Sequence, residues 1–148
     1  MPCMKKYRDC DEWVRLAITI NGRNIQFASR RLRDDFDMAC IAVTHQQDFY
    51  PDDTIKHLSK RLRDSKEIAL LDMEKGHGCF DDYSKRLRND LELAVLNAEK
   101  GCGSIENYSK KLRDSEEVAQ ALIKGGRTYY LYDMSDRIRS LYKRYESN

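Results

Sequence analysis

The chain has 148 residues, of which 41% are hydrophobic and 35% are charged, so it can form a core but carries an unusually polar surface. Its 27 basic and 25 acidic residues leave a formal charge of only +2, which excludes an argument for nucleic-acid binding from bulk charge. The start of the chain is followed by charged residues rather than by an apolar core, as a signal peptide would require, and no apolar run reaches the roughly 20 residues that span a bilayer. We therefore expect a single domain, residues 1–148, that is soluble and cytoplasmic and makes no membrane contact.

One phrase recurs along the chain: a serine, two basic residues, a leucine, an arginine and an aspartate or asparagine. It is complete at 29–34, 59–64, 84–89 and 109–114, and degenerate at 7–9 and 135–140. Its last arginine recurs at steps of 25, 30, 25, 25 and 26 residues, at Arg8, Arg33, Arg63, Arg88, Arg113 and Arg139. So regular a step predicts stacked copies of one structural unit. The expected units are 9–33, 34–63 with an insertion at 45–53, 64–88, 89–113 and 114–148.

Each unit is predicted to open with a helix of about ten residues that starts where the phrase ends. The expected N-caps are Asp9, Asp34, Asp64, Asn89 and Asp114, each followed three residues later by an acid. The helices should end at glycines in the left-handed conformation, at Gly22, Gly76, Gly101 and Gly125-Gly126. Alignment of the units gives three sets of equivalent apolar positions, which we call columns and expect in the core. They are Trp13, Met38, Ile68, Leu93 and Val118; Leu16, Ile41, Leu71, Leu96 and Ala121; and the small Val14, Ala39, Ala69, Ala94 and Ala119.

The remainder of each unit is apolar at positions i, i+3 and i+7, which predicts a second helix. The triplets are Ile25, Ala28, Leu32; Ile55, Leu58, Leu62; Phe80, Tyr83, Leu87; Ile105, Tyr108, Leu112; and Leu131, Met134, Ile138. Two short amphipathic helices cannot bury their apolar faces alone, so neighbouring units must share a core. We expect an all-α fold: a short α-solenoid of about five two-helix units, closed by a C-terminal capping helix with Ile138, Leu141, Tyr142 and Tyr145 on one stripe.

The segment Ile18-Thr19-Ile20-Asn21-Gly22 through Phe27-Ala28-Ser29 and Leu32-Arg33-Asp34-Asp35 resembles a bacterial and phage family of helical repeats, known as a domain of unknown function. The resemblance covers most of residues 9–140 and rests on cap and core positions, so it implies the fold and no catalytic residue. The chain departs from the pattern where no glycine follows near His45 and where Pro51 lies in the insertion. A phage-borne inhibitor or adaptor in the bacterial cytosol, of its maker or of an infected host, is the role that this resemblance suggests.

The basic phrase is the first candidate site. Its candidate residues are Arg30, Arg31, Lys60, Arg61, Lys85, Arg86, Lys110 and Lys111. In a regular stack they would form a ridge that could follow a phosphate backbone. Alternatively, they complement the dipole in the last turn of a helix and pair with the acids that open the next helix. Interleaved acids and the absence of neighbouring aromatic residues favour the second interpretation.

Two groups of aromatic residues are candidates for binding a protein partner. Phe49 and Tyr50 lie in the insertion, where they either meet a partner or fold back over a gap in the stack. Tyr129, Tyr130 and Tyr132 lie near the end of the chain. They could close the stack, mediate self-association through the terminal units or bind a partner.

Cysteine and histidine give little sign of reaction chemistry. The five cysteines, an odd set without a Cys-x-x-Cys pair, predict reduced thiols: Cys3, Cys10, Cys40, Cys79 and Cys102. His77 and Cys102 hold equivalent positions in neighbouring units, roughly 10 Å apart, which is too far for both to bind one zinc ion with Cys79. No nucleophile with a base and no phosphate-binding loop is recognisable. We expect a protein-binding module without enzyme activity, metal or cofactor, and, as the alternative, a nucleic-acid-binding protein that uses the basic ridge.

Overall fold

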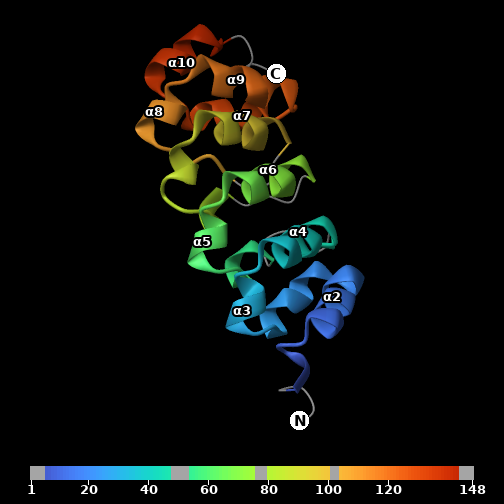
Figure 1. Ribbon diagram of the computed structural model, residues 1–148. Helices are drawn as coiled ribbons and strands as arrows, with labels where there is room; N and C mark the ends of the chain where they lie inside the picture. Colours follow the sequence, from blue (N-terminus) through green and yellow to red (C-terminus); the bar gives the residue numbers. More distant parts are fainter. Residues whose placement is uncertain (1–5, 48–53, 76–79, 101–103, 144–148) are drawn as a thin grey trace.

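The computed structural model describes residues 6–47, 54–75, 80–100 and 104–143. Its long helices pile up in chain order, and each packs against the next (Figure 1). They are α2 (Asp11–Ile20), α4 (Phe36–Thr44), α6 (Lys66–Glu74), α7 (Leu91–Lys100) and α9 (Glu116–Lys124). No described residue lies in a β-strand. The all-α class predicted from the sequence is confirmed.

A second row of short elements runs along the other edge of the pile (Figure 1). It contains the 3-10 helices η1 (Gly22–Phe27), η2 (Ile55–His57), η3 (Phe80–Asp82), η4 (Leu87–Asn89) and η5 (Thr128–Asp133), and the short α-helices α3 (Arg30–Arg33), α5 (Lys60–Arg63), α8 (Lys110–Arg113) and α10 (Asp136–Leu141). Among the described residues, no helix combines the length and the apolar character that crossing a membrane requires.

The prediction of one continuous second helix per unit is wrong. In the first unit, Ala28 and Ser29 are extended, with ψ near 160°, and they separate η1 from α3. The serine then acts as the N-cap of α3, because its hydroxyl accepts a hydrogen bond from the backbone N–H of Leu32. The triplets of apolar residues are nevertheless buried in every unit. A 3-10 turn followed by one α-turn places residues i, i+3 and i+7 on the core side much as a single helix would.

The N-caps of the long helices lie one residue later than predicted. Asp35, Ser65, Asp90 and Ser115 accept hydrogen bonds from the backbone three residues on, whereas Cys10 caps α2 without a side-chain bond. The residues predicted as caps are therefore available for another task, which is to connect neighbouring phrases.

The predicted role of glycine holds at Gly126, which has φ +71°, and is wrong at Gly22, which has no positive φ. Gly22 is instead needed for close packing, because a Cβ there would lie 1.8 Å from the carbonyl oxygen of Ala42 in α4. Gly76 and Gly101 lie outside the described residues.

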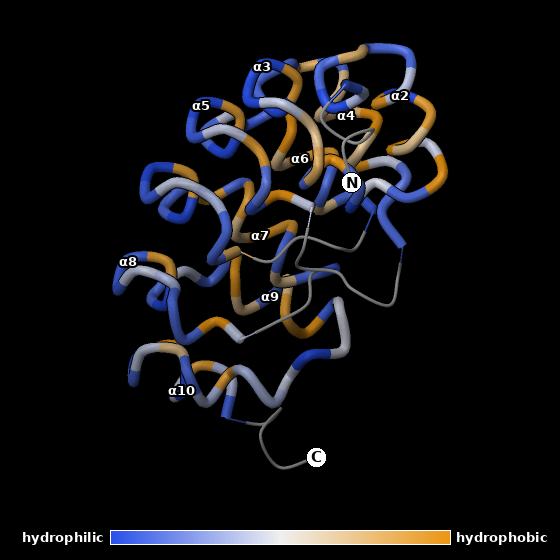
Figure 2. Tube along the Cα trace, turned by 90° about the horizontal axis from the view of Figure 1, so that it is seen from below, coloured by the Kyte–Doolittle hydropathy of each residue, from blue (hydrophilic) through white to orange (hydrophobic). Residues whose placement is uncertain are grey.

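The core includes the small-residue column, the four later members of the Trp13 column and the apolar triplets, and it lies between the two rows. Figure 2 shows hydrophobic segments on this inner side and hydrophilic ones on the outer edge of α3, α5, α8 and α10. Three residues that we expected in the core or in the capping stripe are exposed: Trp13, Leu16 and Leu141. Of these, Trp13 and Leu16 lie on α2, at one end of the pile.

Candidate functional site

A repeated set of hydrogen bonds, which we call the seam, joins each phrase to the preceding one. At the first seam, the backbone N–H of Ser29 donates to the carbonyl of Arg8 at 2.7 Å, and its hydroxyl donates to Asp9 at 2.6 Å. Arg31 reaches the same aspartate with its Nε, at 2.9 Å, and with an Nη2 bond to the backbone carbonyl, also at 2.9 Å. One carboxyl group thus accepts from a hydroxyl and a guanidinium group of the next phrase.

The seam repeats at the equivalent positions of the other units. Ser59 and Arg61 bind Asp34, Ser84 and Arg86 bind Asp64, and Ser135 and Arg137 bind Asp114. The hydrogen bond from the serine hydroxyl, helped by the arginine, lowers the pKa of each of these aspartates below its ordinary value, at Asp9, Asp34, Asp64 and Asp114. The seam is weaker in one place: Ser109 binds Asn89 at 2.7 Å, and Lys111 stands where the other units have arginine.

The seam divides the predicted basic ridge into two sets. Arg31, Arg61 and Arg86 form ion pairs at 2.9–3.1 Å with the acid that closes the preceding phrase. The sequence suggested pairing with the acids that open the next helix, so the partner was placed in the wrong unit. A second set of exposed cations makes no ion pair with any described residue: Arg30, Lys60, Lys85, Lys110 and Lys111. Only this second set can meet a phosphate without opening the seam.

The aromatic residues predicted as binding sites differ in their exposure to solvent. Tyr129 and Tyr132 are exposed, whereas Tyr130 packs partly against the core beneath the guanidinium group of Arg127, 4.7 Å from its ring centroid. Phe49 and Tyr50 lie outside the described residues. Two of the three terminal tyrosines are therefore exposed, and the third lies partly in the core.

Within the described part of the chain, the largest concentration of exposed apolar side chains lies at the other end of the pile, on the first unit. We call it the α2 face. Its members and their exposed fractions are Tyr7 (40%), Trp13 (52%), Leu16 (55%), Ile20 (69%) and Phe27 (53%). Trp13, Leu16 and Ile20 follow one another at helical spacing, and Val14 and Ile18 face the core. At 100° per residue, α2 is apolar over roughly 200° of its circumference. That is wider than its contact with the core requires.

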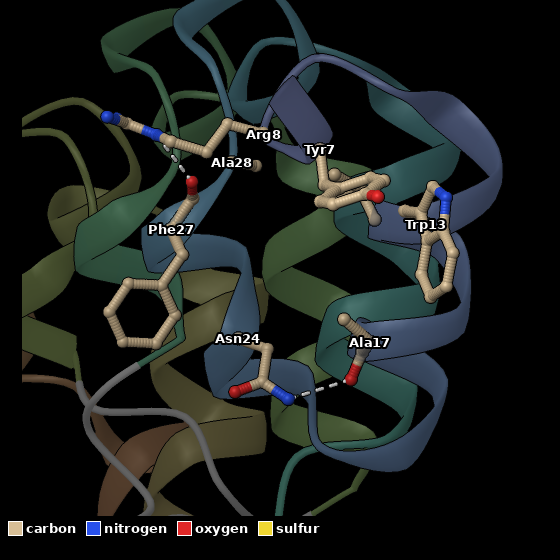
Figure 3. A pocket seen from close by; sticks show the side chains of 8 residues that line it. Tyr7, Arg8, Trp13, Ala17, Asn24, Phe27 and Ala28 are labelled. Carbon is tan, nitrogen blue, oxygen red and sulfur yellow. Dashed lines mark hydrogen bonds between the residues drawn. The ribbon is translucent and has the colours of Figure 1, made fainter. Parts of the chain in front are cut away.

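The α2 face is hollowed into a groove of about 410 Å³ between α2, η1 and the segment before α2. Figure 3 shows Tyr7 and Trp13 on one side and Phe27 on the other. The two aromatic rings of the first side lie 4.9 Å apart at 60°. Arg8 is the charged residue of the lining, and its Nε donates to the Phe27 carbonyl at 2.8 Å. The groove thus combines aromatic walls with one cation at its edge.

The described residues offer little for catalysis or metal binding. They contain no group of three or more His, Cys, Asp or Glu side chains placed to hold a metal ion. Cys10 and Cys40 are free thiols, and partial burial raises the pKa of Cys40, which makes it a poorer nucleophile. His77, Cys79 and Cys102 lie outside the described residues.

The sequence did not reveal the α2 face, because Trp13 and Leu16 share columns with residues expected in the core and were therefore expected to be buried. The available signal was a departure from the repeat: Ile20 and Phe27 stand where later units carry polar residues or glycine. Comparison with family models, curated proteins and solved structures gives no match for this chain. Its function must therefore be argued from its own surfaces.

Proposed function

We propose that this chain is a non-enzymatic protein-binding module and that the α2 face is its binding surface. The observation that carries the proposal is the exposure of Trp13. Its counterparts in the later units are 0–1% exposed: Met38, Ile68, Leu93 and Val118. The first unit therefore presents to solvent a surface of the kind that the other units bury.

Burial of this surface would contribute favourable free energy to association. Full burial of one large apolar side chain contributes about 1.5–3 kcal/mol, and the α2 face offers five that are partly exposed. Tryptophan, tyrosine and arginine are also the residues most often found at energetically dominant positions of protein interfaces. Trp13, Tyr7 and Arg8 supply all three within one groove. The resemblance to phage-borne repeats adds the further proposal that the partner is a bacterial protein, such as a component of a defence system.

The test is affinity capture from a bacterial lysate after nuclease treatment. Ile20→Lys with Phe27→Asp introduces residues that later units carry at these positions, so the fold should persist. The proposal expects partners captured by the wild type to be lost with this variant. The control, Tyr129→Ser with Tyr132→Ser, removes two equally exposed aromatics elsewhere and should retain them. Equal capture by both variants would refute the α2 face as the binding surface.

Nucleic-acid binding is the second candidate function, supported by the exposed cations outside the seam. The variant Lys60→Gln with Lys110→Gln removes two of them and leaves every seam arginine in place. If these cations contact phosphates, the slope of log K against log salt should decrease in magnitude by about two. The control is Lys75→Gln with Lys100→Gln, which removes the same charge from the C-terminal ends of α6 and α7. Equal slopes for both variants would exclude the ridge.

A further inference from the structure

The packing of the pile itself indicates what kind of structure covers an α2-like face. Each of α4, α6, α7 and α9 packs against the long helix of the unit before it (Figure 1). The positions equivalent to Trp13 are buried in all four, and the long helix that packs against each of them from the preceding unit has nine or ten residues. The α2 face is the surface on which one further helix would pack if this series of interfaces were extended.

The first unit also differs from the others at two positions, and both differences favour the binding of a partner. Ile20 corresponds to His45, Lys75, Lys100 and Gly125, and Phe27 corresponds to His57, Asp82, Asn107 and Asp133. Terminal repeats ordinarily have a polar outer side, because nothing covers them. Here two positions that are polar or glycine in later units are large and apolar at the outer end. A unit that served only to terminate the pile would have the opposite pattern.

Charge distinguishes between a second copy and a different protein as the covering element. The lining of the groove contains Arg8 and no acid, and Arg8 makes no ion pair with any described residue. Two copies joined through their grooves would bring two such arginines together and supply no carboxylate from the lining. A partner with an acidic residue at the edge of an apolar stripe satisfies both the groove and the cation.

We infer that the groove binds an amphipathic α-helix of a partner protein. The helix lies along α2 as each long helix lies along the next, with its apolar stripe on Trp13 and Phe27 and a carboxylate facing Arg8. This inference rests on the proposed function and specifies the chemistry of the partner. It predicts that a short helix suffices, without the remainder of the partner.

A peptide of residues 64–75 is a suitable probe, because it contains α6, which covers α7, and carries acids at Asp64, Glu67, Asp72 and Glu74. An isolated helix of this length is marginal in water, so a lactam on its polar side should hold it helical, with circular dichroism as the check. Trp13 is the only tryptophan of the chain, so its emission reports on the groove directly. We expect a saturable blue shift with this peptide and none with a helical peptide of scrambled sequence. Ile20→Lys with Phe27→Asp should weaken binding at least tenfold.

Three results would overturn the inference. The first is the absence of a saturable shift with a peptide that is demonstrably helical. The second is a blue shift that depends on protein concentration alone, with a sedimenting dimer that Phe27→Asp abolishes, because the occupant is then a second copy. The third is peptide binding only after removal of residues 1–5, because that segment is then the occupant. If the peptide fails but lysate capture still requires Ile20 and Phe27, the proposed function stands and only the helical partner is refuted.

Discussion

The Tyr108 hydroxyl donates a hydrogen bond to Oδ1 of Asn97 at 2.5 Å inside the core. One unit earlier, Tyr83 donates to the carboxyl group of Asp72 in the same arrangement. At the equivalent positions in other units, both members are apolar and buried: Ala42 with Leu58, and Leu122 with Met134. Polar and apolar residues thus change in pairs, as expected because a buried polar group without its partner destabilises the fold.

Removal of either tyrosine hydroxyl should therefore destabilise the chain. We expect Tyr108→Phe to lower the free energy of unfolding by about 1 kcal/mol and Tyr83→Phe by about 2 kcal/mol, because acidic acceptors form the stronger bonds. Urea denaturation followed by circular dichroism measures both. Tyr132→Phe, at an exposed position, is the control and should change little. A loss at Tyr83 no larger than that at Tyr132 would contradict the pairing.

The seam aspartates predict a loss of stability in acid. Because their pKa values are lower in the folded chain, they stabilise it fully above the unfolded value near 4, and this contribution is lost as the pH falls through the lower folded values. Ser84→Ala removes the principal donor to Asp64, so the pKa of that carboxyl group should rise toward 3.8. NMR titration of the aspartate carboxyl groups measures the change. Asp34 keeps Ser59 and serves as the internal control; an unchanged pKa at Asp64 would show that the serine is not its main donor.

Much of the fold follows from the sequence because the repeat places equivalent residues in equivalent surroundings. The small-residue column and the apolar triplets could be predicted, because burial depends on an apolar periodicity that recurs in each unit. The N-caps could not be placed to the residue, because Asp34 and Asp35 are both good caps. The structure uses Asp35 for the helix and Asp34 for the seam. That choice depends on Ser59 and Arg61, which belong to the next phrase.

The candidate site was less predictable for a related reason. Equivalent positions are buried in every unit only where a neighbouring unit covers them. Among the described residues, no unit precedes the one that contains Trp13. The basic residues posed a similar difficulty, because adjacent cations of one phrase have different tasks. Arg61 binds Asp34, whereas Lys60 is exposed and makes no ion pair with the residues that the structure describes. Only the three-dimensional stack separates them.

Completion of the incomplete seam should stabilise the chain. Asn89→Asp with Lys111→Arg would give the fourth unit the side chains that bind one another in the other units. Because the pair is exposed, we expect a modest rise of the melting temperature, about 2 °C at low salt, that diminishes at high salt. Each single substitution should give less than half of the gain. An additive result would show that the two new side chains do not interact.

Close packing at Gly22 gives the largest expected effect. Gly22→Ala would place a methyl group 1.8 Å from the Ala42 carbonyl oxygen, and backbone atoms cannot move aside as a flexible side chain can. We expect a loss of about 3 kcal/mol or more in the free energy of unfolding, as for an overpacked core. Gly126→Ala is the matched control: it has open space around its Cβ and only the strain of φ +71°, which should be about 1 kcal/mol. Since Gly22 joins the first unit to α4, its substitution should also detach α2, which a red shift of Trp13 emission would report. A loss for Gly22→Ala no larger than that for Gly126→Ala would show that the contact between Gly22 and the Ala42 backbone tolerates a methyl group.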